Sequence, residues 1–212
     1  MKVFLPDFLS SKNTVPKKIV LLLPLLCCLY NVNAQVLFRI EPGFLIENES
    51  KNLGLLLNIE PKVQISENSI IGLRFGIALN SQKFKNIDNS QFLIDNQDNY
   101  AVISFVPTYD YFFNKNKYRR PYLGLGLGYY LLFDDLDVLT PNGSREVIKG
   151  STKNQLGVLL RGGLEVGTIR CGLEYNLINK ADIEMPNGQK IGVVNNNYLG
   201  LSIGFIIGRK KN

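Results

Sequence analysis

The 212-residue chain has no histidine, only three cysteines and no apolar run long enough for a helical membrane span. Without histidine, the Ser-His-Asp and Cys-His catalytic arrangements and all histidine-based metal sites are excluded. The apolar run at residues 19–30 contains Pro24 and is shorter than the roughly 20 residues with which a helix crosses a bilayer. A hydrophobic content of 45% excludes both a polytopic helical membrane protein and a disordered chain.

Residues 1–34 are predicted to be a cleaved secretory signal peptide. Lys17 and Lys18 precede the apolar run, and Val32 and Ala34 place small side chains at the two positions that a signal peptidase recognises. The mature chain then comprises residues 35–212, and its formal net charge falls from +6 to +3. This smaller charge removes the main argument for a nucleic-acid partner.

The first segment has two other possible interpretations, an uncleaved membrane anchor and a lipoprotein signal. An uncleaved anchor requires a longer apolar run. A lipoprotein linked through Cys27 or Cys28 requires a small residue before the cysteine, where Leu26 precedes Cys27. Once the signal peptide is removed, Cys171 is the one remaining cysteine, so no internal disulfide can form.

The mature chain lacks helical periodicity, and its apolar residues recur at every second position. Eight such segments are separated by polar connectors. They are longer than an average strand and match the roughly 9 to 11 residues with which a tilted strand crosses a bilayer. The predicted strands cover residues 36–47, 53–65, 70–80, 100–112, 121–133, 155–167, 169–178 and 197–208.

The connectors differ in length between the two ends of the predicted strands. Short turns at one rim and long loops at the other are typical of an outer-membrane barrel whose short turns face the periplasm. We therefore predict an all-β fold, an eight-stranded antiparallel up-and-down transmembrane β-barrel in the outer membrane of a Gram-negative bacterium. The short connectors are 66–69, 113–120 and 168, the long polar ones are 81–99, 134–154 and 179–196, and 48–52 is short although it lies at the long-loop rim.

Residue size and charge distinguish the two faces of each strand. In segment 36–47, Phe38 and Ile40 lie on one face, and Arg39 and Glu41 lie on the other. The interior of an eight-stranded barrel is just wide enough for side chains. We therefore expect the bulky Leu, Ile and Phe residues to face lipid and the small and charged residues to face the lumen. A soluble periplasmic ligand-binding barrel, with these faces inverted, is the alternative.

Eleven charged residues lie within the predicted strands, five basic and six acidic, all on the face of small residues. Because an unpaired interior charge is costly, we expect a structural network of ion pairs in the lumen. The predicted network comprises Arg39, Glu41, Glu60, Lys62, Arg74, Asp110, Arg161, Glu165, Arg170 and Glu174, and Glu47 is the eleventh charged residue.

Two groups of carboxylates are candidates for acid–base chemistry or cation binding. Glu165 and Glu174 on neighbouring strands could form an acid–base pair, but pairing with Arg161 and Arg170 is favoured. A loose acidic group in the connector 134–154 lacks the ligand pattern of a calcium loop, so a solvated loop is favoured over cation binding. That group consists of Asp134, Asp135 and Asp137.

A basic run in the connector 113–120 is interpreted as a solvated periplasmic turn, with contact to anionic lipid or a periplasmic partner as the alternative. It consists of Lys115, Lys117, Arg119 and Arg120. Aromatic residues near the strand ends predict two belts at the membrane interfaces. The short-turn belt comprises Phe38, Tyr109, Tyr111, Phe113, Tyr118 and Tyr122, and the long-loop belt comprises Phe44, Tyr100, Tyr129, Tyr130, Phe133, Tyr175 and Tyr198.

The segments RPYLGLGLGYY at residues 120–130 and NYLGLSIGFIIGRKK at residues 197–211 resemble strands of the outer-membrane β-barrel family of Bacteroidetes. That family includes PorT-like proteins and is broadly similar to OmpA-type and OmpX-type barrels. The resemblance covers the whole mature chain and implies no catalytic residues. Many such barrels end on an aromatic residue, whereas this chain ends at Asn212, with Phe205 as its last aromatic residue.

The expected function is that of a non-enzymatic integral outer-membrane barrel, a structural or recognition scaffold with its loops outside. The alternative is a barrel for small-solute transport, through a narrow gated path, or a PorT-like secretion accessory. The expected partners are outer-membrane lipid and an extracellular or periplasmic protein. We expect no nucleic-acid partner, no cofactor and no metal ion.

Overall fold

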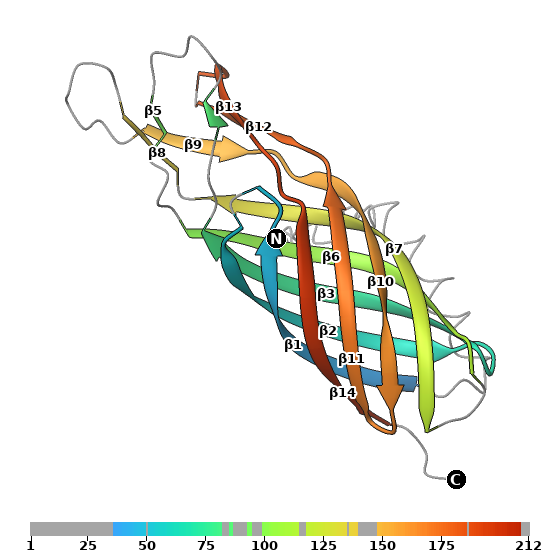
Figure 1. Ribbon diagram of the computed structural model, residues 1–212. Helices are drawn as coiled ribbons and strands as arrows, with labels where there is room; N and C mark the ends of the chain where they lie inside the picture. Colours follow the sequence, from blue (N-terminus) through green and yellow to red (C-terminus); the bar gives the residue numbers. More distant parts are fainter. Residues whose placement is uncertain are drawn as a thin grey trace, which may run out of the picture. The chain divides into compact units, whose positions relative to one another are not determined.

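The computed structural model contains eight long strands that close into an antiparallel barrel (Figure 1). Backbone contacts divide the chain into the units Met1–Ala34 and Gln35–Asn212. Within the second unit the structure describes residues 36–49, 51–81, 85–86, 93–94, 99–114, 118–134, 136–139, 148–185 and 187–208. The predicted signal peptide, including Cys27 and Cys28, lies outside the described residues. In the described ranges, no helix is long and apolar enough to cross a membrane.

Each barrel strand pairs with its neighbours along the chain, and the first strand closes the barrel against the last. The predicted eight-stranded up-and-down barrel is confirmed, and the predicted strand ends agree with the observed ones to within a few residues. The barrel strands are β1 (Val36–Glu47), β2 (Leu53–Gln64), β3 (Ser69–Ser81), β6 (Asn99–Phe112), β7 (Arg119–Asp134), β10 (Gln155–Val166), β11 (Ile169–Ile178) and β14 (Tyr198–Ile207).

Alternate side chains in each strand point to opposite faces of the barrel wall. In β14, Leu199 and Leu201 are exposed on the outside, whereas Ser202 is buried inside. Among the described strand residues that point outward, Arg119, the first residue of β7, is the one charged side chain. The soluble-barrel alternative requires the opposite arrangement of bulky and polar residues.

Four prolines point outward within barrel strands, and three of them each interrupt one hydrogen-bonded ladder. The β1–β14 pairing skips Pro42, the β2–β3 pairing skips Pro61, and the β6–β7 pairing skips Pro107. Proline lacks the backbone N–H that a ladder bond requires. The first two interruptions lie on opposite edges of the β1–β2 hairpin, so this hairpin is attached to the rest of the wall by two incomplete ladders.

The long connectors are not irregular loops, which corrects our expectation. They contain six short strands that form a second sheet in the order β4-β13-β12-β9-β8-β5, here called the extension sheet (Figure 1). Buried Ala181 and Ile183 of β12 belong to the same hydrophobic cluster as Tyr130 and Leu159 of the barrel, so the core is continuous between the two sheets. These strands are β4 (Lys85–Asn86), β5 (Leu93–Ile94), β8 (Leu136–Leu139), β9 (Ile148–Thr152), β12 (Ala181–Glu184) and β13 (Lys190–Val194).

Four tyrosines assigned to the aromatic belts point into the barrel instead. Tyr100, Tyr122, Tyr130 and Tyr198 are all buried. Tyr122, Tyr130 and Tyr198 each share the inward face with a glycine two positions away. Exposed aromatic residues remain near both rims, including Phe38, Tyr109, Tyr111, Phe113 and Tyr118 near the short turns and Phe44, Tyr129 and Phe133 near the extension sheet.

Candidate functional site: the charged lumen

The lumen is filled in layers, with charged side chains between two hydrophobic clusters. One cluster lies at the short-turn end and includes Leu37, Phe112 and Ile206. The other includes Leu45 and Leu56 near the opposite end of the barrel and continues into the extension sheet. The charged layer is therefore separated from solvent on both sides by apolar side chains.

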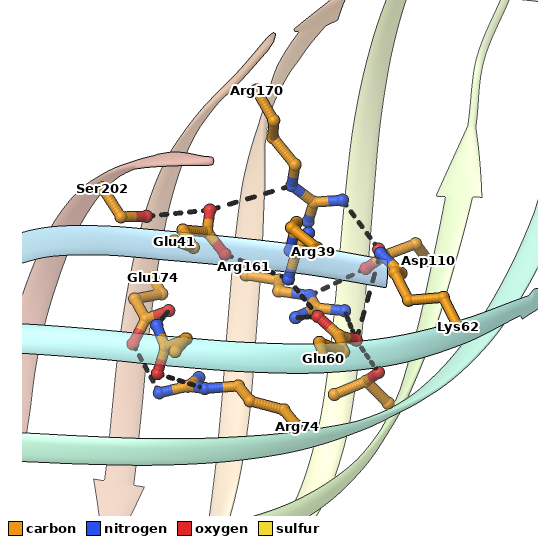
Figure 2. Close-up of polar contacts among 12 residues, drawn as sticks. Arg39, Glu41, Glu60, Lys62, Arg74, Asp110, Arg161, Arg170, Glu174 and Ser202 are labelled. Carbon is orange, nitrogen blue, oxygen red and sulfur yellow. Dashed lines mark hydrogen bonds and ion pairs between the residues drawn. The ribbon is translucent and has the colours of Figure 1, made fainter. Parts of the chain in front are cut away.

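Two carboxylates, Glu60 of β2 and Asp110 of β6, form the centre of the charged layer (Figure 2). Arg161 donates to both Glu60 oxygens, at 2.9 and 2.8 Å, and through Nε to Asp110 at 2.8 Å. Arg39 and Thr108 also donate to Glu60, so this carboxylate has three partner residues on three other strands. Bidentate arginine–carboxylate contacts of this kind fix geometry as well as charge.

Asp110 and Glu41 extend the cluster to the seam between β1 and β14. Asp110 accepts from Lys62 and from Arg170, the latter at 2.8 Å. Glu41 lies 3.0 Å from Arg39 and 4.0 Å from Arg170, and Ser202 of β14 donates to it at 2.9 Å. We call Arg39, Glu41, Glu60, Lys62, Asp110, Arg161 and Arg170 the central cluster, which joins side chains from five strands.

Among the described residues, the buried charges of the lumen are balanced. The central cluster contains four cations and three carboxylates, all buried. Arg74, Arg120, Glu165, Glu174 and Glu47 complete a set of six buried basic and six buried acidic residues. This balance avoids a net charge in a barrel interior that apolar residues close at both ends, where an uncompensated charge is costly.

A second ion pair lies beside the central cluster, toward the extension sheet. Arg74 donates to Glu174 at 2.8 Å and to the side-chain oxygen of Asn58 at 2.9 Å. Asn176 donates to Glu174 at 3.0 Å and accepts from the Tyr130 hydroxyl at 2.8 Å. These amide and hydroxyl groups add hydrogen bonds around the pair, whereas Nη1 of Arg74 is buried without a hydrogen-bond partner among the described residues.

Arg120 belongs to the lumen and not to a solvated turn, which corrects our interpretation of the basic run. It is buried, lies 3.8 Å from Glu165, and stacks 3.8 Å above the ring of Phe112. It also donates to the backbone oxygen of Glu67 at 3.1 Å. Arg119 is exposed, and Lys115 and Lys117 lie outside the described residues.

Glu165 and Glu174 do not form an acid–base pair, and their expected partners were wrong. The β10–β11 register does place Arg161 opposite Glu174 and Arg170 opposite Glu165. The two arginines instead contact Glu60 and Asp110 across the lumen, whereas Glu165 and Glu174 pair with Arg120 and Arg74. Backbone register brings residues side by side, but long side chains reach partners on distant strands.

Inward glycines provide the space that this cluster occupies. A Cβ atom on Gly72 would lie 2.5 Å from a Glu60 oxygen and 3.0 Å from the Thr108 hydroxyl. On Gly172, it would lie 2.8 Å from the Tyr122 hydroxyl and 3.1 Å from a Glu41 oxygen. The small inner residues are therefore a steric requirement of the buried charges.

The described residues contain no group of three or more cysteine, aspartate or glutamate side chains placed to hold a metal ion. The acidic group at 134–137 includes Asp135, which lies outside the described residues. Of the predicted network residues, seven form the central cluster, Arg74 and Glu174 form the adjacent pair, and Glu165 pairs with Arg120. Arg120 is the lumen residue that the strand prediction missed.

A closed up-and-down barrel of eight antiparallel strands defines a well-known class of small barrel proteins. Two solved structures share it with this chain. The Neisserial surface protein A (NspA) has a TM-score of 0.53 at 14% identity, covering 84% of this chain and all of the other. The outer membrane protein OprG from Pseudomonas aeruginosa has a TM-score of 0.54 at 13% identity, covering 83% of this chain and 98% of the other.

At such low identity, these two similarities concern the fold alone. The sequence matches no known family model, and it matches no curated protein. The neighbours therefore support the closed eight-stranded barrel fold, while the narrower resemblance to PorT-like barrels has no support from them.

Proposed function

We propose that this chain is an integral outer-membrane β-barrel that acts as a non-enzymatic structural or recognition scaffold. The observation that carries the proposal is the outer wall of the barrel. Leu57, Leu125, Leu160 and Leu201 all expose about half of their surface on this wall, and no charged residue interrupts it between the rims in the described strands. An apolar surface of this extent is stable in lipid and not in water.

The sealed lumen favours a scaffold over a solute channel. The charged residues of the central cluster hold one another, and hydrophobic clusters lie on both sides of them. Eight strands enclose only enough space for side chains, which these residues occupy. Passage of a solute would require several buried ion pairs to separate at once.

A recognition role is supported by the extension sheet. Its strands share a hydrophobic core with the barrel. The barrel therefore holds the surface of the extension sheet in a fixed position. Binding residues are commonly carried on segments that a rigid scaffold holds in place. The same surface suits a secretion-accessory role of the PorT-like kind, which is the second candidate. An enzymatic role is disfavoured because the chain has no histidine and the lumen carboxylates are engaged by cations.

Fractionation followed by gel electrophoresis tests the proposal. We expect the protein in the outer-membrane fraction, migrating as a compact band that shifts on boiling. Recovery from the periplasm without detergent would contradict the membrane assignment. Planar-bilayer recordings distinguish a scaffold from a solute channel. We expect no steady current, and steady channel currents would favour transport.

A further inference from the structure

The outer wall carries a groove of about 460 Å³ where β7, β10 and β11 approach the rim nearest the extension sheet, beside Asn197, which directly precedes β14. We call it the outer-rim groove. The part of the groove farther from this rim is apolar and is formed by Leu127, Leu156, Val158 and Leu177. Val158 pairs in register with Leu127 on one side and Leu177 on the other, so these three side chains form a row across three strands.

The part of the outer-rim groove nearest the rim is polar and includes a lysine side chain. It is lined by Asn179, Lys180 and Asn197. Asn179 follows directly on β11, and its backbone N–H donates to Leu156 at 3.2 Å, which continues the ladder to the rim. The groove therefore changes from aliphatic to hydrogen-bonding within two residues along the strands, and no carboxylate lines it.

The polar groups of this rim are available to a ligand. The Asn197 side-chain oxygen accepts from the Ile178 N–H at 2.7 Å, which leaves its amide nitrogen as a donor. Lys153 and Lys190 in the extension sheet region are paired with Glu184 and Asp182. Lys180, by contrast, is exposed and has no ion pair with any residue in the described ranges.

We propose that the outer-rim groove binds a phosphate-bearing lipid of the outer leaflet. An acyl chain lies along the row of Leu127, Val158 and Leu177, and the phosphate accepts from Lys180, Asn179 and Asn197. The proposal rests on the proposed function, because only a membrane-embedded barrel meets this ligand. A lysine near the membrane surface adds to the affinity for an anionic lipid.

Native mass spectrometry of the folded protein in uncharged detergent tests the ligand. The probes are dimyristoyl phosphatidic acid and dimyristoyl phosphatidylcholine, which have the same acyl chains and different headgroup charge. We expect phosphatidic acid to be retained about fivefold better. Lys180→Gln should abolish the preference, whereas Val158→Phe, which fills the groove, should lower the retention of both lipids.

Lys153→Gln is the matched control, because it removes another lysine near the same rim. It should leave the preference unchanged. Equal retention of the two lipids, or an equal effect of Lys153→Gln, would overturn the proposal. Displacement of phosphatidic acid by millimolar inorganic phosphate would assign the site to a free anion. A protein without a compact unboiled band contradicts the membrane barrel itself, whereas a folded barrel without lipid preference contradicts the groove alone.

Discussion

The inner and outer faces of the same strands follow different rules. On β2, Leu57 and Ile59 point outward and are exposed, whereas Asn58 and Glu60, which alternate with them, are buried and accept hydrogen bonds from arginines of other strands. The outer face has to be apolar, and many side chains meet that condition. The inner face has to place each charge beside its partner, and few side chains meet it. The effect of a substitution should therefore depend first on whether the residue faces the lumen or the outside, and only then on its type.

The largest effect is expected inside, at Glu60. Glu60→Gln keeps the shape of the side chain but leaves Arg161 and Arg39 without their shared carboxylate. Removing one partner from a buried ion pair costs about 3 to 5 kcal/mol. Urea unfolding of the barrel in lipid vesicles measures this loss of unfolding free energy. Glu184→Gln in the exposed pair with Lys153 is the control, for which less than about 1 kcal/mol is expected. Equal effects at the two sites would mean that burial in the lumen does not raise the cost of breaking an ion pair.

The next effect concerns charge on the outer face. Leu125→Arg places a guanidinium midway along β7 on the outer face, which we propose lies in lipid. Such a charge at the bilayer midplane costs about 2 to 4 kcal/mol, so we expect a loss of membrane assembly. The yield of the compact unboiled band after folding into vesicles gives the result. Leu125→Ile should assemble normally, because the lipid side requires only an apolar side chain. Normal assembly of Leu125→Arg would mean that this face does not contact lipid.

A smaller net effect is expected when an inner pair is removed as a whole. In the Arg74→Met/Glu174→Met double variant, no charge is left unpaired, so stability should change by only about 1 kcal/mol. Glu174→Met alone leaves the buried charge of Arg74 without its partner, so this variant should be clearly less stable than the double variant. Unfolding by urea of the two variants and the wild type completes the comparison. A double variant less stable than the single one would show that the pair itself stabilises the lumen.

Residue parity along the strands predicted most of this architecture. The period of two located the eight strands and the inward face of the charged residues. The same parity could have corrected two errors, since Arg120 and Tyr122 share the inward face with Gly124. The alternation of Ala181, Ile183 and Met185 was also a visible strand signal within a connector predicted as a loop.

Ion-pair partners could not be predicted in the same way. Sequence and register place neighbouring residues, and they suggested that Glu165 and Glu174 would pair with arginines of the adjacent strand. The actual partners depend on which side chains meet across a narrow lumen closed in three dimensions, as Arg161 does with Glu60. The extension sheet depends likewise on contacts between segments far apart in the chain, such as β13 with β4.

The smallest effect is expected at an exposed ion pair, that of Lys190 and Asp182 in the extension sheet. The hydrogen bond to Asp182 and the charge of its carboxylate raise the pKa of Lys190 above the ordinary lysine value. A raised lysine pKa stabilises the fold below the ordinary value and loses this contribution as pH rises through the folded-state pKa. NMR titration of the Lys190 ammonium should show the pKa falling in Asp182→Asn and unchanged in Glu49→Gln. An unchanged pKa in Asp182→Asn would mean that the pair does not persist in solution, in contrast to the pairs of the lumen.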